Sequence, residues 1–574
     1  MKVFRPLLAP AAVLALAGCQ TLPATQSPAV DIGVVQAADP RAAEAGREML
    51  RRGGSATDAA IAVMLALTVV EPQSSGIGGG GFMVRGEADG TVTTYDGRET
   101  APSAAGPEWF FGEDGEPQTY AEVVLTGLSV GVPGNIALAA KAHAEHGRLP
   151  WAELFEPAIA LAEGFVMNPR LNDSLDGSIE RAGQDPLMRR TFYTQAGEPR
   201  PIGTVISRPE LAETFRRLAA EGPEAMYAGE DAEALAGHIA ANTPRDAAMR
   251  AQDITSYEAK ERDAVCGTYR AYRICSMGPP TSGGIALLQM LGQLERFDIA
   301  ALGPQSVEFW HLFTQSQLLA YADRERYTGD SDFVSVPVRE LTDPDYLSTR
   351  SALIDPARTL GSYQAGDPVG LLALRPDGDE PQEHGTTHFV AVDREGAMVS
   401  YTSTVEGGFG SGLQFGGYYL NNELTDFSFS PERDGVPVAN RVEGGKRPRS
   451  SMSPAIVWDP AGEPFLVIGG AGGPFIPVQT ARSIIGIVDF DMALEEAFSL
   501  PIVMGFGPNL FVEADTWLAS QEDALAALGY ENIRTGPQPF GSVGQVGAIN
   551  RGGEWSGAYD PRFRGRLEAA ALED

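Results

Sequence analysis

Residues 385–404 read GTTHFVAVDREGAMVSYTST, and this stretch decides which fold we expect. Apolar residues alternate with polar ones on either side of Asp393-Arg-Glu-Gly396, which predicts a β-hairpin whose first strand begins at the pair Thr386-Thr387. The first threonine follows the small residue Gly385 at the start of this strand. Cleavage of the chain at that point would leave its hydroxyl as a nucleophile on a rigid support. Threonines are common in strands, so the pair alone does not establish a site.

The composition of the 574 residues is typical of a soluble α/β enzyme rich in tight turns, because 43% are hydrophobic and there are 67 glycines and 41 prolines. The length fits one large fold or two interwoven subunits. The formal net charge of -33 would repel a phosphate backbone, which argues against nucleic acid as a partner. We interpret the acidic surface as a device for solubility.

The N-terminal residues 1–18 have the layout of a secretion signal. Lys2 and Arg5 precede an apolar stretch from Leu7 to Leu16, which is too short to span a bilayer as a mature helix. An ordinary signal with the small-residue cleavage site Ala15-x-Ala17 is one interpretation of this segment.

The interpretation we favour rests on Leu16-Ala-Gly-Cys19, which resembles a bacterial lipobox. In such a motif the cysteine is acylated after cleavage and becomes the new N-terminus. We therefore expect lipidation at Cys19 and a lipidated tether over residues 19–31. This predicts a periplasmic protein that meets the membrane only through a lipid anchor.

Two cysteines remain, Cys266 and Cys275, on either side of a turn expected at Arg270-Ala271. Period-2 alternation around that turn predicts a β-hairpin with the cysteines opposite each other. Because an oxidising compartment permits a disulfide, we expect one there. The alternative is two reduced cysteines packed as small apolar groups.

A glycine-rich run, Gly76-Ile-Gly-Gly-Gly-Gly81, contains a formal GxGxxG pattern. It follows a helix expected from a capping box at Ser55 and Asp58 to about Val70, and it opens a strand expected from Phe82 to Tyr95. A dinucleotide-binding fingerprint has the reverse context, strand before and helix after, so we reject that function. The glycines instead predict close approach of the backbone to another element.

A second pattern, Gly127-Leu-Ser129-Val-Gly131, matches the nucleophile elbow of a serine hydrolase. It lies between a strand-like stretch at 123–125 and a helix expected near Asn135. The last histidine of the chain is His388, whereas that class of hydrolase needs one near the end of the chain. We therefore do not assign Ser129 as a nucleophile.

The histidines occur as two pairs, His384 with His388 and His143 with His146. Neither pair has a third metal ligand at a recognisable spacing. We predict structural histidines and no metal site.

Eight blocks give the chain its resemblance to a known family. They occur in the family's order over nearly the whole mature chain: Glu71-Pro-Gln-Ser-Ser-Gly-Ile-Gly-Gly-Gly-Gly-Phe-Met83, Arg98-Glu-Thr-Ala-Pro102, Gly131-Val-Pro-Gly134, Pro279-Pro-Thr-Ser-Gly-Gly284, Thr386-Thr-His388, Leu420-Asn-Asn422, Ser450-Ser-Met-Ser-Pro454 and Gly472-Gly473. The chain resembles the γ-glutamyltransferase (γ-glutamyltranspeptidase) family of the N-terminal nucleophile hydrolase superfamily.

This resemblance implies an α/β (α+β) fold, namely a four-layer αββα sandwich built from one precursor. Cleavage before Thr386 would give a large subunit, residues 32–385, and a small catalytic subunit, residues 386–574, intertwined as a heterodimer. The freed α-amine would act as base for the hydroxyl of its own threonine, which is otherwise a poor nucleophile at neutral pH. Thr404 resembles the family threonine that orients the nucleophile.

The oxyanion hole that the resemblance implies is Gly472-Gly473. These glycines lie between a strand expected at Phe465–Ile468 and a helix expected near Pro477. Backbone N–H groups in such a turn can point at a negative oxygen. A simple tight turn is the alternative.

The γ-glutamyl group carries an α-carboxylate and an α-ammonium, so its pocket needs side chains that bind each of these charges. By resemblance Arg98 and the pair Ser450-Ser451 bind the carboxylate, the arginine through its fork of donors. Glu423 and Asp426 bind the ammonium.

Two features depart from many relatives. Glu406 stands where many have asparagine, and we expect an extra carboxylate facing the ammonium. The stretch 426–450 is shorter than in relatives where it forms a lid, which leaves acceptor selection open.

The resemblance implies a γ-glutamyltransferase and glutathione hydrolase without a cofactor. Its donors would be glutathione or other γ-glutamyl compounds, and its acceptors would be water, amino acids or peptides. One alternative is an acylase acting on glutaryl or cephalosporin-type amides, which lack the ammonium that Glu423 and Asp426 would bind. The other is a catalytically inactive lipoprotein that binds amino acids, and the presence of Thr386, Thr404 and Gly472-Gly473 argues against it.

Overall fold

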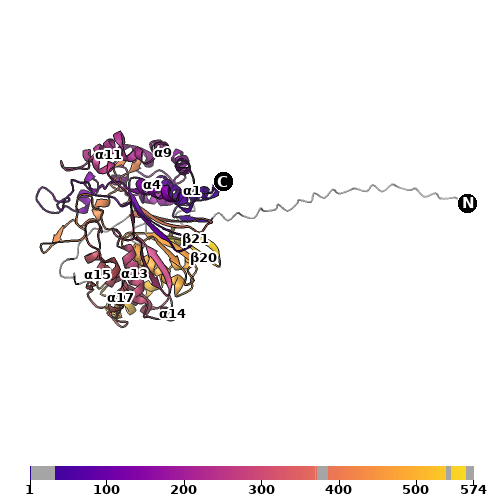
Figure 1. The fold of residues 1–574 in the computed structure, drawn as a ribbon, viewed down its shortest axis with the longest axis vertical. Helices are drawn as coiled ribbons and strands as arrows, with labels where there is room; N and C mark the ends of the chain where they lie inside the picture. The colour runs from indigo at the N-terminus through magenta and orange to yellow at the C-terminus, as the bar shows by residue number, and fades with distance from the viewer. Residues whose placement is uncertain (2–32, 369, 371–375, 377–384, 538–543, 564–574) are drawn as a thin grey trace. The chain divides into compact units, whose positions relative to one another are not determined.

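The computed structural model describes residues 1, 33–368, 370, 376, 385–537 and 544–563 (Figure 1). The expected signal, the lipidated Cys19 and the tether therefore lie outside the described residues. His384 does so as well. Among the described residues, no helix is both long and apolar enough to cross a membrane.

The first of two large sheets is antiparallel and contains the predicted hairpin of residues 385–404. Backbone hydrogen bonds join its strands in the order β1 (Val34–Ala37), β9 (Gly385–Val392), β10 (Met398–Glu406), β2 (Gly80–Gly86), β3 (Val92–Asp96) and β6 (Lys260–Arg262). β9 and β10 are central and buried along their whole length. The hairpin prediction is confirmed.

The second sheet is also antiparallel, in the order β21 (Glu554–Tyr559), β20 (Gly544–Arg551), β16 (Pro464–Ala471), β15 (Ala455–Trp458), β8 (Tyr272–Ser276) and β7 (Val265–Tyr269). Both sheets thus combine strands from before and after the 385/386 bond. This is the interweaving that two intertwined subunits from one precursor require.

The predicted cysteine hairpin is confirmed in β7 and β8. Arg270 and Ala271 have φ of 49° and 68°, the left-handed pair of a two-residue hairpin turn. Cys266 pairs with Cys275 across the strands and the two form a disulfide.

Side-chain alternation along β9 separates two of the three largest apolar cores. Phe389 and Ala391 point to the core beneath α2 (Ala56–Val70), whereas Val390 and Val392 pack with Val467 of the second sheet. The third core lies between the second sheet and the helices that cover it. These three largest cores separate four layers, so the αββα architecture is confirmed.

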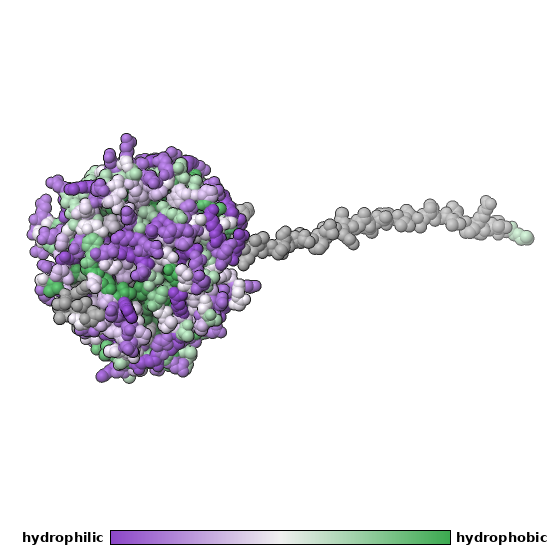
Figure 2. Space-filling model, viewed as in Figure 1, coloured by the Kyte–Doolittle hydropathy of each residue, from purple (hydrophilic) through white to green (hydrophobic). Residues whose placement is uncertain are grey.

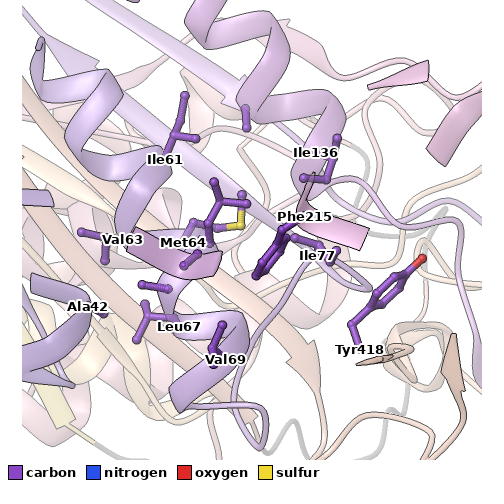
Figure 3. Packing of buried hydrophobic residues seen from close by; sticks show 14 of the residues in the cluster. Ala42, Ile61, Val63, Met64, Leu67, Val69, Ile77, Ile136, Phe215 and Tyr418 are labelled. Atoms are coloured by element: carbon purple, nitrogen blue, oxygen red, sulfur yellow. The ribbon is translucent and has the colours of Figure 1, made fainter. Parts of the chain in front are cut away.

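The helices cover the two outer sheet faces (Figure 1). On the first sheet lie α1 (Pro40–Arg51), α2, α4 (Asn135–His146) and α9 (Pro209–Glu221), and Figure 3 shows Ile61, Met64 and Leu67 of α2 packed with Ile136 and Phe215. On the second lie α13 (Gly283–Leu294), α15 (Val307–Tyr327) and α18 (Phe475–Val488). The face seen in Figure 2 is largely hydrophilic, in keeping with the many acidic residues.

The remaining helices and strands complete the fold. The helices are α3 (Tyr120–Val123), α5 (Glu156–Glu163), α6 (Pro169–Leu175), α7 (Ile179–Ala182), α8 (Pro186–Phe192), α10 (Glu224–Tyr227), α11 (Gly229–Ala241), α12 (Ala251–Thr255), α14 (Ile299–Leu302), α16 (Val338–Leu341), α17 (Pro344–Ser351), α19 (Leu494–Phe498) and α20 (Glu522–Ala527). The strands are β4 (Phe165–Val166), β5 (Val205–Ile206), β11 (Gln414–Phe415), β12 (Tyr418–Tyr419), β13 (Glu432–Arg433), β14 (Val436–Pro437), β17 (Val503–Phe506), β18 (Asn509–Glu513) and β19 (Asn532–Gly536).

Two local expectations were wrong. The strand expected from Phe82 to Tyr95 is two strands, β2 and β3, because Asp89 and Gly90 form a turn in which Gly90 has a φ of 88°. The stretch at 123–125 is not a strand, since α3 ends within it after a capping box of Thr119 and Glu122. The capping box at Ser55 and Asp58 is confirmed.

The glycine-rich run makes the close approach that its composition predicts. A Cβ at Gly78 would lie 2.1 Å from the carbonyl oxygen of Tyr419, and one at Gly79 would lie 2.0 Å from that of Thr404. The run therefore brings residues before the 385/386 bond directly against the backbone of β10.

Candidate active site

Thr386 is the second residue of β9 and its side chain is buried, with 5% of the residue exposed. Its hydroxyl donates a hydrogen bond of 2.6 Å to the carbonyl oxygen of Gly385. The hydroxyl is therefore held against the carbonyl group of the peptide bond that precedes it. A Cβ at Gly385 would lie 2.3 Å from the carbonyl oxygen of Glu406, which explains why this position is glycine.

Thr404 lies on β10, and its hydroxyl donates to the same oxygen of Gly385 at 2.5 Å. It also accepts a hydrogen bond of 2.8 Å from the N–H of Glu406. Because this N–H occupies the hydroxyl oxygen, the hydroxyl proton is directed at Gly385. We expected Thr404 to orient the hydroxyl of Thr386, and in the uncut chain the two hydroxyls meet at one carbonyl oxygen.

Gly472 and Gly473 connect β16 to α18 in a turn with φ of 118° and 54°. Neither N–H donates to another of the described residues. Successive contacts of β16 advance toward the start of β9: the carbonyl oxygen of Ile468 accepts from Ser400, and Gly469 lies against the ring of His388. β16 therefore runs toward the Thr386 end of β9, and Gly472-Gly473 follow its last residue, Ala471.

Arg98, Glu423 and Asp426 form a buried charged cluster. Arg98 is 1% exposed, and its guanidinium bonds to both carboxylates, at 2.5 Å in the case of Asp426. The guanidinium also donates to the carbonyl oxygens of Pro448 (3.2 Å) and Arg449 (2.9 Å). The structure thus brings the residues expected to bind a carboxylate together with those expected to bind an ammonium.

The pair Ser450-Ser451 continues the same segment. Ser450 Oγ accepts from the N–H of Met452 at 3.1 Å, and Ser451 Oγ accepts from Arg324 at 2.8 Å. Arg324, on α15, also donates to Ser282 at 2.8 Å. A serine hydroxyl that accepts from a cation is polarised to donate its own proton, which suits it to bind an anion.

Glu99 adjoins the charged cluster, and sequence analysis gave it no role. It is fully buried, and loss of solvation raises the pKa of its carboxyl to about 7, against the opposing charge of Arg98. A Cβ at Gly80 would lie 2.6 Å from its Oε2, so the glycine-rich run makes room for it.

Glu406 is buried with a φ of 71°. Its carboxylate accepts from Asn422 and, at 3.4 Å, from the hydroxyl of Tyr120. Arg181 donates to the side chain of Asn422 at 2.7 Å. The sequence did not indicate Tyr120 or Arg181, whose partners lie hundreds of residues away.

The rejected candidates have structural partners. Ser129 is fully buried, and its hydroxyl donates to the carbonyl oxygens of Val124 and Thr126, each at 2.9 Å. Burial lowers the pKa of His388 to about 3, and its ring bonds to Thr402 at 2.8 Å. Within the described part of the chain, three or more His, Cys, Asp and Glu side chains nowhere gather as a metal site would require.

Two facing sheets enclosed by helices, with a threonine at the start of a central strand whose hydroxyl meets the preceding carbonyl, define the class of N-terminal nucleophile hydrolases. Within that class the chain belongs to the gamma-glutamyltranspeptidase family, whose model matches residues 42–570.

Similar proteins include the glutathione hydrolase proenzyme of Bacillus subtilis (strain 168), 34% identical over 93% of this chain and 90% of that protein. The acylase ACY 1 proenzyme of Pseudomonas sp. (strain V22) is also 34% identical, over 94% of this chain and 93% of that one. Among solved structures, cephalosporin acylase from Bacillus halodurans superposes with a TM-score of 0.79 at 25% identity, covering 92% of this chain and 94% of that chain.

Proposed function

We propose that this protein is a precursor that cuts itself between Gly385 and Thr386 and then acts as a γ-glutamyltransferase and glutathione hydrolase. The observation that carries the proposal is the convergence of the Thr386 and Thr404 hydroxyls on the carbonyl oxygen of Gly385. Membership of the gamma-glutamyltranspeptidase family and a relative named glutathione hydrolase proenzyme support it.

In self-cleavage the Thr386 oxygen forms a bond to the Gly385 carbonyl carbon, and the C–N bond then breaks. The departing nitrogen takes the hydroxyl proton and becomes an α-amine, leaving an ester between the two residues. Water hydrolyses that ester to a Gly385 carboxylate and a free Thr386 hydroxyl. Thr404 stabilises the negative charge that develops on the carbonyl oxygen.

In turnover the neutral α-amine takes the proton of the Thr386 hydroxyl as that oxygen attacks a γ-glutamyl amide. The N–H groups of Gly472-Gly473 bind the oxyanion, and the donor amine leaves with a proton. The γ-glutamyl ester then passes to water or to an amino acid or peptide. This gives hydrolysis with water and transpeptidation with the other acceptors.

The donor pocket is formed by the cluster around Arg98. Arg98, Ser450 and Ser451 bind the α-carboxylate, and Glu423 and Asp426 bind the α-ammonium. Glu406 and its partners Asn422 and Tyr120 form a neighbouring polar wall.

The subunit boundary is tested by denaturing electrophoresis and N-terminal sequencing. After removal of the signal we expect two fragments, residues 19–385 (the tether with the large subunit) and 386–574, and the smaller should begin Thr-Thr-His. A smaller fragment with another first residue, or an active chain that stays whole, contradicts the proposal. Product analysis with a γ-glutamyl anilide, with and without a dipeptide, then separates hydrolysis from transfer.

The second candidate, an acylase, is favoured by the relative named acylase ACY 1 proenzyme. Glutaryl amides bring no ammonium, whereas the pocket buries two carboxylates around Arg98. Comparison of kcat/KM for a γ-glutamyl and a glutaryl anilide decides between them. An inactive binding lipoprotein would remain a single chain and turn over neither substrate.

For location, we propose export to the periplasm with a lipid on Cys19, because Leu16-Ala-Gly-Cys19 resembles a bacterial lipobox. Cys19→Ser should abolish labelling with a radioactive fatty acid and release the protein from the membrane fraction. Unchanged labelling would contradict the assignment.

A further inference from the structure

Thr386 lies where the ladder between β9 and β10 is interrupted. Ser403 pairs with Thr387 and Glu406 pairs with Gly385, so the register shifts at Thr386. On the other side of β9, pairing with β1 runs from Val392 to Phe389. Thr387 is therefore the nearest residue after Thr386 that a regular ladder pair holds.

After cleavage, the position of Thr386 depends even more on Thr387. Once Gly385 has become a chain end, Thr386 is an N-terminal residue whose covalent attachment is to Thr387 alone. An N-terminal residue frays unless its neighbour is fixed. The angle at which Thr386 presents its amine and hydroxyl then depends on how firmly Thr387 is held.

Glu71 holds the side chain of Thr387. The hydroxyl of Thr387 donates to Glu71 Oε2 at 3.0 Å, and both residues are 1% exposed. Alternation along β9 turns Thr387 toward the helical layer and Thr386 toward the second sheet, so Glu71 does not face the reacting hydroxyl. Glu71 caps the C-terminal end of α2, a helix whose residues are all buried.

Arg170 holds Glu71 in turn. Its guanidinium, from α6, forms a buried ion pair with Glu71 Oε1 and lies 4.7 Å from the ring centre of Phe563. Glu71 and Arg170 precede the 385/386 bond, whereas Thr387 and Phe563 follow it. The chain of contacts therefore clamps the new N-terminus of one segment to a helix of the other.

We propose that Glu71 is a positioning residue for the nucleophile, fixing Thr386 through the hydroxyl of Thr387 during both self-cleavage and turnover. The inference rests on the proposed role of Thr386. A small misplacement of a reacting group can cost about 100-fold in rate without loss of substrate binding. The Glu71–Thr387 contact should therefore affect kcat and maturation, and leave KM nearly unchanged.

The decisive pair of variants is Thr387→Val and Thr387→Ser. Valine keeps the β-branched shape but removes the donor, whereas serine keeps the donor. We expect Thr387→Val to lower kcat for a γ-glutamyl anilide and the rate of self-cleavage by about 10- to 100-fold, with KM within about twofold. Thr387→Ser should stay within about threefold of the parent in all three.

A matched control is Thr94→Val. Thr94 is a fully buried threonine on β3 of the same sheet, and its hydroxyl donates to the carbonyl oxygen of Arg262 at 2.6 Å. Its loss should lower the melting temperature about as much as Thr387→Val does and leave kcat unchanged. An equal fall in kcat for both variants would assign the effect to the sheet as a whole and overturn the proposal.

A second arm serves if Thr387→Val does not fold. Glu71→Asp keeps the charge opposite Arg170 but withdraws the carboxylate from Thr387, and it should reproduce the fall in kcat at constant KM. In the double variant of Glu71→Asp with Thr387→Val, the two decreases in kcat should not add, because both substitutions remove the same Glu71–Thr387 contact.

Two failures are distinguishable. A parent protein that is not cut before Thr386 contradicts the proposed function. A parent that is cut and active, with Thr387→Val or Glu71→Asp as fast as Thr387→Ser, contradicts the role of Glu71 alone.

Discussion

Thr404→Val tests whether one hydroxyl supports both the self-cleavage and the later turnover. The substitution keeps the β-branched shape that suits a buried strand and removes the proton that Thr404 donates to the Gly385 carbonyl oxygen at 2.5 Å. Removing one donor aimed at a developing oxyanion costs about 10²- to 10³-fold, or about 3–4 kcal/mol. We expect maturation to slow by that factor.

The assay follows pulse-labelled protein on a denaturing gel and measures the ratio of precursor to fragments over time. Thr404→Ser is the matched control, because it keeps the donor and also the acceptor for the N–H of Glu406, which lies 2.8 Å from the Thr404 oxygen. Serine should therefore mature close to the parental rate. After maturation, kcat of the valine variant should also fall, since its Thr386 hydroxyl has lost an orienting neighbour.

Two results would refute this reasoning. If valine matures as fast as serine, the hydroxyl of Thr404 does not act on the Gly385 carbonyl. If valine matures slowly but melts at a much lower temperature than serine, the slow step reflects a damaged strand and not a missing donor.

Three further predictions concern other residues. Thr386→Ala should give a single, inactive chain, and any fragment on a denaturing gel would show that the nucleophile is elsewhere. Asp426→Asn should lower kcat/KM about 10- to 100-fold more for a γ-glutamyl than for a glutaryl anilide, because only the former brings an ammonium, and an equal loss would give Asp426 a structural role. Glu99→Gln should remove a pH dependence of melting, measured on uncut Thr386→Ala protein. Burial raises the pKa of the Glu99 carboxyl from 4.5 to about 7, so its contribution is present below about pH 4.5 and is lost as the pH rises through 7. A slope in that window that survives the substitution would assign it to another group.

The sequence predicted the elements whose signals are local. The hairpin of residues 385–404 follows from alternation around one turn, and the helix after Ser55 follows from its capping box. At both places where the expectation was wrong, the sequence also carries a local signal for the structure that is observed. Asp89-Gly90 is a pair typical of turns, and it interrupts the strand expected from Phe82 to Tyr95. Thr119 and Glu122 form a capping box, which begins a helix just before the strand expected at 123–125.

The layers and the supporting contacts of the site could not be derived from local patterns. The four-layer architecture came from family resemblance, because periodicity alone does not say which sheet faces which. Glu71 meets Thr387 across 316 positions, and Arg324 meets Ser451 across 127. No spacing rule connects such pairs, although Glu71 and Ser451 each lie in a block that the resemblance had singled out.

The charge balance of the proposed donor pocket explains why its residues suit a zwitterionic substrate. With ionised side chains, Arg98, Glu423 and Asp426 carry one positive and two negative charges in a site almost without solvent. A γ-glutamyl group adds one charge of each sign, so the balance is unchanged, and each new charge finds an opposite partner. A glutaryl group adds only a carboxylate. It would bind Arg98, which already pairs with Glu423 and Asp426, and it would bring no cation for these two carboxylates. Because an uncompensated buried charge is costly, we propose that the pocket discriminates by the ammonium.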